Sequence, residues 1–372
     1  MSHLDDGRVA FVAFGVPGEL VEVTAERVQK DYVKAAVTNV LERASDRVDA
    51  RCPLFGDCGG CQLQHMSYES QCASKEGVVR EQLERIGGLA ADTVRPIVAA
   101  DSPWGYRNHV RFSTGKKFGD IGFIHRVGRR LLKVDSCPIA DDWINALIPA
   151  LQGKGRGLHQ IQVRHSAATG EHLIAPEVPS AEFPTGQNSY TEALARHTFR
   201  VSANSFFQVN GAQAEKLNAL VEETLPKRGS LLVDAFTGVG TFAIGFSGRF
   251  EHVIAIEESG PAIKDAKSNA RRYPNVEIHQ GKVEAILPGL EIAPDAVLLD
   301  PPRPGCAPPV LAKIGEVRPR AVVYVSCNPS TLARDARIIV DAGYRLESVT
   351  PIDMFPQTAH IECVARFIAE EV

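Results

Sequence analysis

The hydrophobic and polar positions of the first fifty residues alternate with a period of two. This alternation is typical of short β-strands with one buried face, and Pro17-Gly18 indicates a turn between two of them. The predicted strands span residues 8–12, 19–23 and 32–40. We expect residues 1–50 to form a small antiparallel β-sheet or β-barrel domain, a module that binds nucleic acid in some proteins and is a structural adaptor in others.

The next part of the chain contains one clear helical pattern. Apolar residues recur at helical spacing in residues 68–86, which predicts an amphipathic helix whose buried face carries Val78, Val79, Leu83 and Ile86. Cys72 lies inside this helix, and we expect its side chain to pack there. We assign residues 51–200 to a central domain.

From Asn204 onward, short apolar runs alternate with helical patterns. The predicted helices span residues 212–224 and 261–271. The predicted strands span residues 230–234, 253–257, 276–279, 296–300, 322–325, 345–352 and 361–368. Such alternation is typical of a doubly wound α/β sheet with helices on both faces. We therefore expect residues 201–372 to form one α/β domain.

The composition fits a protein of the cytoplasm. Hydrophobic residues make up 44% of the 372 residues and charged residues 23%, which is ordinary for globular proteins. No apolar run approaches the ~20 residues that a membrane span needs, and the first residues do not resemble a signal peptide. The formal net charge of -4 means that any surface for a polyanion must be local.

Three cysteines lie close together in a glycine-rich segment. Cys52, Cys58 and Cys61 fall within ten residues, and thiolates at this spacing suit an iron–sulfur cluster or zinc. Cys137 is the expected fourth ligand, because proline follows it as it follows Cys52. His65, the alternative fourth ligand for zinc, is less convincing, so we favour the iron–sulfur cluster. Eight cysteines in a chain of this length do not indicate a secreted disulfide framework.

A basic segment lies between these cysteines. Residues 101–135 contain eight Lys or Arg residues against three Asp, although the whole chain is acidic. Aromatic residues such as Trp104 and Tyr106 are interleaved with the basic ones. This combination suits phosphate contacts and base stacking, so we favour RNA binding over a merely solvated charged face.

Two glycines follow the first strand of the α/β domain. Gly238 and Gly240 open a helix, and Glu257 ends the next strand, where it can accept hydrogen bonds from ribose hydroxyls. This pattern fits a dinucleotide or S-adenosylmethionine, and the lack of a third glycine at the required spacing disfavours the dinucleotide. Asp300 ends a later strand and is followed by two prolines, which form a stiff wall beside the cofactor. Its alternative role is a helix or turn cap.

Cys327 follows the apolar run 322–325 and precedes a helix that begins at Pro329. Ligands of open α/β sheets bind at the carboxyl ends of the strands, where this thiol can reach them. The alternative is an inert buried cysteine.

Five ordered motifs resemble one enzyme family. They are Asn204-Ser-Phe-Phe-Gln-Val-Asn, Asp234-x-Phe-x-Gly-x-Gly-x-Phe, Asp300-Pro-Pro-Arg, Val325-Ser-Cys-Asn-Pro and His360-Ile-Glu. Together they look like the S-adenosylmethionine-dependent RNA uracil-5-methyltransferases, over nearly the whole chain from about Gly7. The cysteine quartet resembles the iron–sulfur members, which are the 23S ribosomal RNA branch and relatives that act on the tRNA T-loop.

The resemblance implies a fold and a set of roles. The fold is α/β: a Rossmann-like class I methyltransferase domain, a central α+β iron–sulfur domain, and a small N-terminal β-barrel of TRAM or OB type that is incomplete here. Cys327 is implied as the nucleophile and Glu362 as the base. The residues implied around the cofactor and target base are Gln208, Phe236, Thr241, Glu257 and Asp300. Those implied on a 4Fe–4S cluster are Cys52, Cys58, Cys61 and Cys137.

Two positions depart from the family pattern. Lys282 stands where the family often has a polar residue that contacts the cofactor, and Thr241 stands where asparagine is common. The cysteine spacing and Met354-Phe-Pro resemble the 23S rRNA branch more closely, and this resemblance implies 23S rRNA as the substrate, with tRNA as the alternative. We expect a monomer.

The chemistry explains why these residue types are needed. Carbon 5 of uracil becomes nucleophilic only after a thiolate adds to carbon 6, and a base must later remove the proton from carbon 5. We therefore expect a site that favours the Cys327 thiolate. His360 is an alternative base, and Phe206 or Phe207 is a candidate to hold a flipped uracil. The competing functions are a small-molecule or protein methyltransferase and a non-catalytic RNA-binding or electron-transfer protein.

Overall fold

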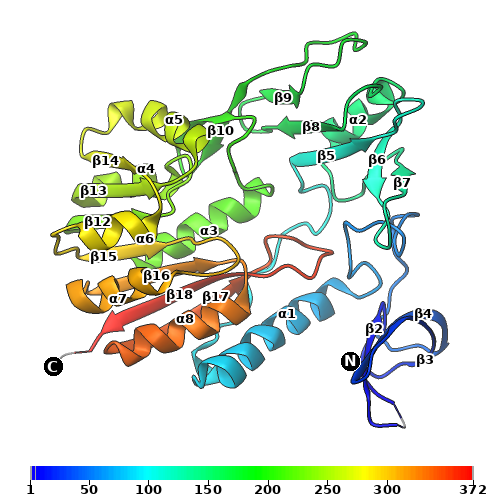
Figure 1. The fold of residues 1–372 in the computed structure, drawn as a ribbon, viewed down its shortest axis with the longest axis horizontal. Helices are drawn as coiled ribbons and strands as arrows, with labels where there is room; N and C mark the ends of the chain where they lie inside the picture. The colour runs from blue at the N-terminus through cyan, green and yellow to red at the C-terminus, as the bar shows by residue number, and fades with distance from the viewer. Residues whose placement is uncertain (1, 5, 371–372) are drawn as a thin grey trace.

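The computed structural model describes residues 2–4 and 6–370. A seven-stranded sheet with its helices forms one side of the molecule, and three smaller sheets extend from it (Figure 1). Among the described residues, every helix is too short or too polar to cross a lipid bilayer.

The large sheet has the strand order β14-β13-β12-β15-β16-β18-β17. Its strands are β12 (Gly229–Ala235), β13 (Phe250–Glu257), β14 (Val276–Gln280), β15 (Ala296–Leu299), β16 (Ala321–Ser326), β17 (Tyr344–Ile352) and β18 (Glu362–Ala369). The first five in spatial order are parallel, whereas β18 is antiparallel to both of its neighbours. The doubly wound prediction is confirmed, and every strand predicted after residue 229 is present.

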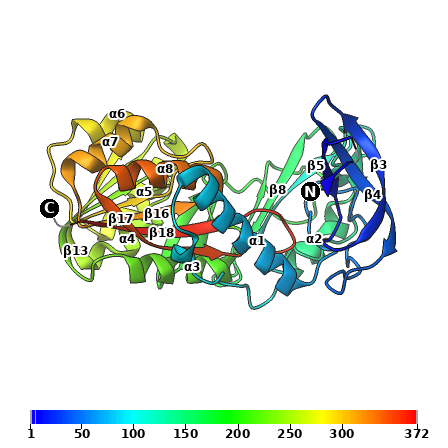
Figure 2. The same cartoon turned by 90° about the horizontal axis from the view of Figure 1, so that it is seen from below.

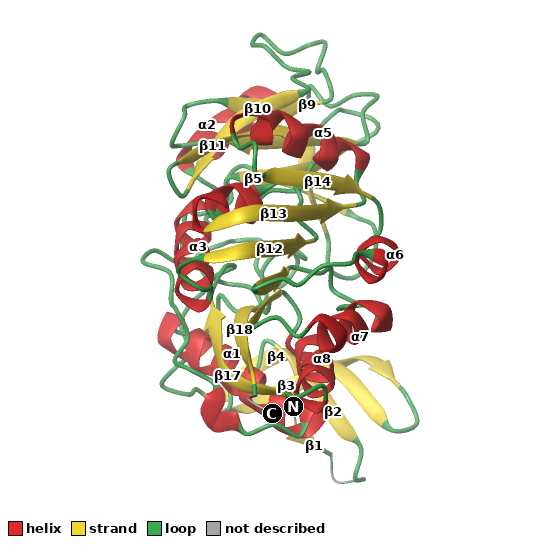
Figure 3. Ribbon diagram, turned by 90° about the vertical axis from the view of Figure 1, so that its left-hand side faces the viewer, coloured by secondary structure: helices red, strands yellow, loops and turns green. Residues whose placement is uncertain are grey.

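Helices cover both faces of this sheet. They are α3 (Gly211–Thr224), α4 (Thr241–Gly245), α5 (Gly260–Asn269), α6 (Val283–Ile286), α7 (Pro308–Val317) and α8 (Pro329–Asp341), with short 3-10 turns η3 (Ser247–Arg249), η4 (Ala270–Arg272) and η5 (Leu287–Gly289). Figure 3 shows β12, β13 and β14 between α3 on one side and α6 on the other. Two apolar clusters fill the space between sheet and helices, and all six residues of β16 are buried between them.

The N-terminal sheet differs from the prediction. Its strands are β1 (Ser2–His3), β2 (Val9–Ala13), β3 (Leu20–Val28) and β4 (Tyr32–Glu42), in the order β1-β2-β4-β3. The expected antiparallel arrangement is wrong for one pair, because β4 lies between β2 and β3 and runs parallel to β2. The described pairings leave β1 and β3 at two open edges, so they form an open mixed sheet and not a closed barrel.

The middle of the chain forms two further sheets and the long helix. A five-stranded antiparallel sheet, β7-β6-β5-β8-β9, packs against α2, and β10 and β11 form a hairpin. Their bounds are β5 (His109–Thr114), β6 (Ile121–Ile124), β7 (Leu131–Lys133), α2 (Asp142–Leu151), β8 (Gln160–His165), β9 (His172–Ala175), β10 (Ser189–Leu194), β11 (His197–Ser202) and the 3-10 turn η2 (Ala91–Thr93).

Helix α1 (Tyr68–Gln82) continues into a π-helical turn, η1 (Leu83–Gly87), and the two pack against α8 of the large sheet. Figure 2 shows α1 running from the large sheet towards the small sheets. Val79 and Leu83 are buried as predicted, but Val78 and Ile86 are exposed. The wider π turn changes the helical spacing after Gln82, which explains the position of Ile86.

Candidate active site

A large cavity lies at the carboxyl ends of the parallel strands. Its volume is about 1490 Å³, which exceeds the roughly 300–1,000 Å³ of a typical small-molecule pocket. All seven residues predicted for catalysis or cofactor binding line it: Gln208, Phe236, Thr241, Glu257, Asp300, Cys327 and Glu362. The cavity continues to the four predicted cluster ligands Cys52, Cys58, Cys61 and Cys137. The fold therefore brings both predicted sets to one space.

The glycine turn after β12 is held by two carboxylates. Asp234 is fully buried and accepts hydrogen bonds from Thr237 Oγ1 at 2.5 Å and from the Ala243 amide at 2.8 Å. Glu257 accepts one backbone amide on each oxygen, from Gly238 at 3.0 Å and from Ser259 at 2.7 Å. Each carboxylate oxygen has two lone pairs, so Glu257 retains capacity for ribose hydroxyls. Sequence reasoning gave no role to Asp234, although its place at a strand end signals one.

The turn also contains backbone strain. Phe236 lies in the left-handed region with φ of 70°, which is unfavourable for a side chain of this size. Such strain persists where the surrounding structure holds it, often at binding sites. The Phe236 and Thr237 amides both donate to the Ile256 carbonyl at 3.0 Å, which fixes the turn against the neighbouring strand.

The segment after Asp300 is anchored to α8. The Arg303 carbonyl accepts hydrogen bonds from Asn328 Nδ2 at 3.1 Å and from Thr331 Oγ1 at 3.2 Å. Buried Asp335 accepts the Cys306 amide at 2.8 Å. A Cβ on Gly305 would lie 2.5 Å from the Asp335 carboxylate, so only glycine fits at that position. This anchoring, which the sequence did not reveal, keeps the Asp300 segment against the start of α8.

Cys327 and Glu362 come from neighbouring strands. Ser326, the last residue of β16, pairs with Cys363 of antiparallel β18. Glu362, the first residue of β18, therefore lies alongside Cys327, the residue after β16. Both side chains line the cavity together with Asp300. The predicted nucleophile and the predicted base thus share one wall.

The electrostatic setting of Cys327 differs from the expectation. Burial raises the pKa of its thiol, the carboxylates of Glu362 and Asp300 raise it further, and the Arg303 guanidinium lowers it. The expectation of a thiolate-favouring site is therefore wrong, because the groups around Cys327 together raise the pKa of its thiol. Burial, and then the charge of Asp300, also raises the pKa of Glu362 well above its ordinary value of 4.5. The Cys327 thiolate and the Glu362 carboxylate would therefore repel each other if both were ionised.

Several other predicted residues also line the cavity. His360, the alternative base, lies 3.3 Å from the Arg303 guanidinium through its Nδ1. Phe206 is 68% exposed, whereas Phe207 is 6% exposed and packs in an apolar cluster with Phe199. Of the two phenylalanines, Phe206 is therefore the one whose ring is free to contact a ligand.

The four cysteines predicted as cluster ligands all line the cavity. They are free thiols, each partly exposed, but no group of three or more His, Cys, Asp or Glu residues in the described chain is placed to hold one metal ion. His65, the alternative ligand, stacks on Phe55 with ring centroids 5.6 Å apart. Cys72 is buried in α1, as expected.

Asp300, which is partly exposed to the cavity, makes the stability of the protein depend on pH. Burial, then the charges of Asp234 and Glu257, raises the pKa of Asp300 from 3.8 to about 7. As the pH rises, the Asp300 carboxyl therefore loses its proton at a lower pH in the unfolded chain than in the folded protein. The stabilising contribution is complete below about pH 4, decreases towards about pH 7 and is absent above it.

We expect Asp300→Asn to gain stability relative to the wild type by up to roughly 4 kcal/mol between about pH 4 and pH 8. Urea unfolding of both proteins at the two pH values measures this difference. A difference in unfolding free energy that does not change with pH would show that Asp300 is not protonated in the folded state.

In the comparison with known proteins, the family models and the curated relatives are all described as RNA methyltransferases. A family model described as tRNA (Uracil-5-)-methyltransferase matches residues 290–369, and one described as RNA cap guanine-N2 methyltransferase matches residues 229–307. Proteins named uncharacterized RNA methyltransferase from Halalkalibacterium halodurans and Gloeobacter violaceus are both 34% identical to this chain. The alignments cover 97% and 98% of this chain and 92% of each relative.

A solved structure is similar over the same length. It is the tRNA (uracil-54, C5)-methyltransferase of Pyrococcus abyssi in complex with S-adenosyl-L-homocysteine, with 26% identity and a TM-score of 0.77. The alignment covers 98% of each chain, so the similarity includes the small sheets as well as the large one.

Proposed function

The chain belongs to the RNA methyltransferases of the uracil-5 type and uses S-adenosylmethionine. From that premise we propose that it makes 5-methyluridine in 23S ribosomal RNA. The observation that carries the proposal is the position of Cys327 beside Glu362 in the cavity that Asp300 and the glycine turn also line. A small-molecule methyltransferase needs no such thiol.

The proposed reaction has three steps. The Cys327 thiol loses its proton to solvent, and the thiolate adds to carbon 6 of a flipped uracil, which makes carbon 5 nucleophilic. S-adenosylmethionine supplies the methyl group that carbon 5 takes. The Glu362 carboxylate then removes the proton from carbon 5, the bond between sulfur and carbon 6 breaks, and the thiolate leaves. The raised pKa of Glu362 makes it a stronger proton acceptor once it is ionised.

The remaining cavity residues have proposed supporting roles. Gln208, Phe236, Thr241 and Glu257 hold the cofactor, and Asp300 holds the polar edge of uracil, which selects uracil over cytosine. Phe206 stacks on the flipped base, which its exposed ring supports. We also propose the division into an N-terminal domain (1–50), a central domain (51–200) and a methyltransferase domain (201–372).

The substrate assay uses RNA that carries tritium at carbon 5 of uracil. We expect 23S rRNA to release tritium to water when S-adenosylmethionine and the protein are present. A tRNA substrate is the second candidate, because the Pyrococcus abyssi protein acts on uracil 54 of tRNA. If tritium is released from tRNA alone, the substrate is tRNA and not 23S rRNA. If it is released from neither RNA, the assignment of uracil as the target base is refuted.

The four cysteines are proposed to hold a 4Fe–4S cluster with a structural or RNA-positioning role. We expect anaerobically purified protein to contain roughly four iron atoms per chain and Cys58→Ser to lose them. Cys72→Ser is the matched control, since that thiol is buried in α1 away from the cavity. Iron retained by Cys58→Ser would contradict the ligand set. Loss of the cluster with unchanged folding and RNA affinity would contradict its role.

RNA contact is proposed for the unpaired part of the basic segment. Arg126, Arg130 and Lys133 form ion pairs with carboxylates. Arg111 lines the cavity and has no ion-pair partner among residues 2–4 and 6–370. We expect Arg111→Ala to weaken RNA binding and to lower the slope of log affinity against log salt by about 1. Lys133→Ala is the control, because its charge already pairs with Asp120; equal effects of both variants would contradict a phosphate contact at Arg111.

A further inference from the structure

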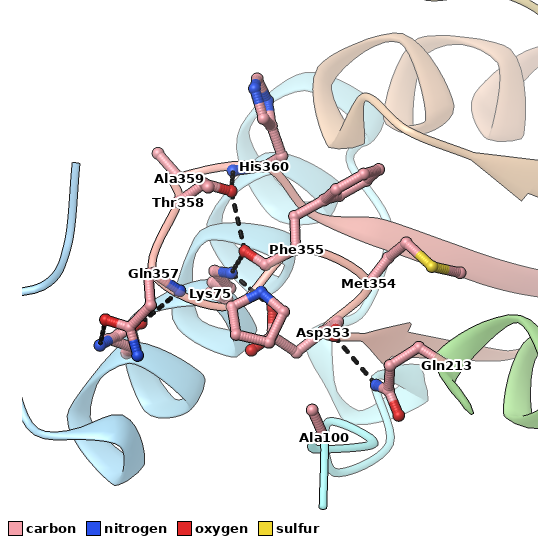
Figure 4. A network of polar contacts seen from close by, with 12 residues as sticks. Lys75, Ala100, Gln213, Asp353, Met354, Phe355, Gln357, Thr358, Ala359 and His360 are labelled. Atoms are coloured by element: carbon pink, nitrogen blue, oxygen red, sulfur yellow. Dashed lines mark hydrogen bonds and ion pairs between the residues drawn. The ribbon is translucent and has the colours of Figure 1, made fainter. Parts of the chain in front are cut away.

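The loop between β17 and β18 carries the proposed base at its end. This loop, residues 353–361, is called the base loop here, and Glu362 follows it directly as the first residue of β18. Figure 4 shows its side chains surrounded by polar groups from other parts of the chain. Inside the loop, Thr358 Oγ1 donates to the Phe355 carbonyl at 2.8 Å.

A buried ion pair holds the start of the base loop to α1. Lys75 Nζ lies 2.6 Å from Asp353 Oδ1, and the two side chains are 2% and 0% exposed. The same ammonium donates to the Phe355 carbonyl at 3.1 Å. A charge pair removed from water in this way is costly to separate, so it fixes the loop relative to the helix.

A reciprocal amide pair holds the middle of the loop. Gln71 Nε2 donates to Gln357 Oε1 at 3.0 Å, and the Gln357 backbone amide donates to Gln71 Oε1 at 3.0 Å. Gln357 has a positive φ of 69°, which is unfavourable for a side chain other than glycine, asparagine or aspartate. Helix α1 therefore stabilises a strained point of the loop.

The same residue is attached to the cysteine segment. The amides of Gln62 and Leu63, which follow Cys61, both donate to the Gln357 carbonyl at 3.0 Å. In return, the Ala359 amide donates to Gln62 Oε1 at 3.2 Å. The proposed cluster-binding segment and the base loop thus form one hydrogen-bonded unit.

From these contacts we propose that Gln71, Lys75 and Gln62 are positioning residues for Glu362, and that through them α1 and the cysteine segment control removal of the carbon 5 proton. This inference rests on the proposed function. The hydrogen bonds of these three residues go to the base loop and not to the segment after β16 that carries Cys327, so we expect them to act on the base and not on the nucleophile. Proton transfer needs the carboxylate within about 2.6–3.2 Å of its target, whereas methyl transfer does not depend on the base.

The test separates the two steps in a single turnover. RNA with tritium at carbon 5 and S-adenosylmethionine with a ¹⁴C methyl group report proton removal and methyl transfer independently, and a denaturing gel reports the covalent adduct between protein and RNA. Gln71→Met keeps the side-chain length and deletes both contacts to Gln357, together with the hydrogen bond from Gln71 Nε2 to the Met66 carbonyl. Gln82→Met is the matched control on the same helix, since Gln82 Oε1 accepts a hydrogen bond from Ser330 and does not contact the base loop.

We expect wild type and Gln82→Met to release tritium as fast as they transfer methyl. In Gln71→Met, tritium release should slow by about tenfold or more while methyl transfer changes little, and methylated adduct should accumulate. Equal slowing of both steps, or no change, would overturn the inference. Absence of tritium release by the wild type would instead refute the proposed function. If Gln71→Met does not fold, Gln357→Gly is held to the same outcomes, because it accepts the positive φ and removes the side-chain amide that Gln71 Nε2 contacts, while the backbone amide that donates to Gln71 Oε1 remains.

Discussion

Replacement of Cys327 by alanine should abolish methylation of the RNA. Without the thiolate, carbon 5 of uracil is too weak a nucleophile to attack a sulfonium, so we expect the rate to fall by at least about 10⁴-fold. Tritium release from RNA labelled at carbon 5 measures the loss, and equilibrium binding of S-adenosylmethionine checks that the cavity is intact.

Cys306→Ala is the matched control for this variant. Cys306 is also a free thiol that lines the cavity, but it is buried beside Asp335 and has no proposed role in the reaction. We expect its substitution to leave most of the activity. Substantial tritium release by Cys327→Ala would refute covalent catalysis and restore a mechanism without a thiol.

Replacement of Glu362 by glutamine should separate methyl transfer from release of the product. The amide cannot take the proton from carbon 5, so the methylated base stays bonded to Cys327. We expect a covalent complex of protein and RNA on a denaturing gel and a fall in turnover of about 10²–10⁴-fold. The complex should carry the methyl group of S-adenosylmethionine.

The same experiment decides between the two possible bases. His360 lines the cavity near Arg303, and burial, followed by the positive charges of Arg303, Lys75 and Arg107, lowers its pKa. A neutral imidazole is a possible proton acceptor. If His360→Gln accumulates the adduct and Glu362→Gln does not, the roles of the two residues are exchanged.

The sequence by itself determined the strands of the large sheet and the side chains that follow them. The central strands β15 and β16 are short apolar runs that are buried on both faces, so local pattern is sufficient to identify them. A residue that directly follows such a run lies at the strand's carboxyl end, which places Asp300 and Cys327 at the same edge. The glycines at 238 and 240 are needed because both have positive φ, and this requirement is visible in the sequence.

Only the tertiary structure decided how distant segments meet. The parallel pairing of β2 with β4 and the insertion of β18 between β16 and β17 are choices of strand order that no local periodicity specifies. The second of these places Glu362 beside Cys327. Lys75 and Asp353 are 278 positions apart in the chain, and only the packed fold buries them together. The raised pKa of Cys327 has the same origin, because burial and the charges of neighbouring strands depend on which segments pack together and not on the residue itself.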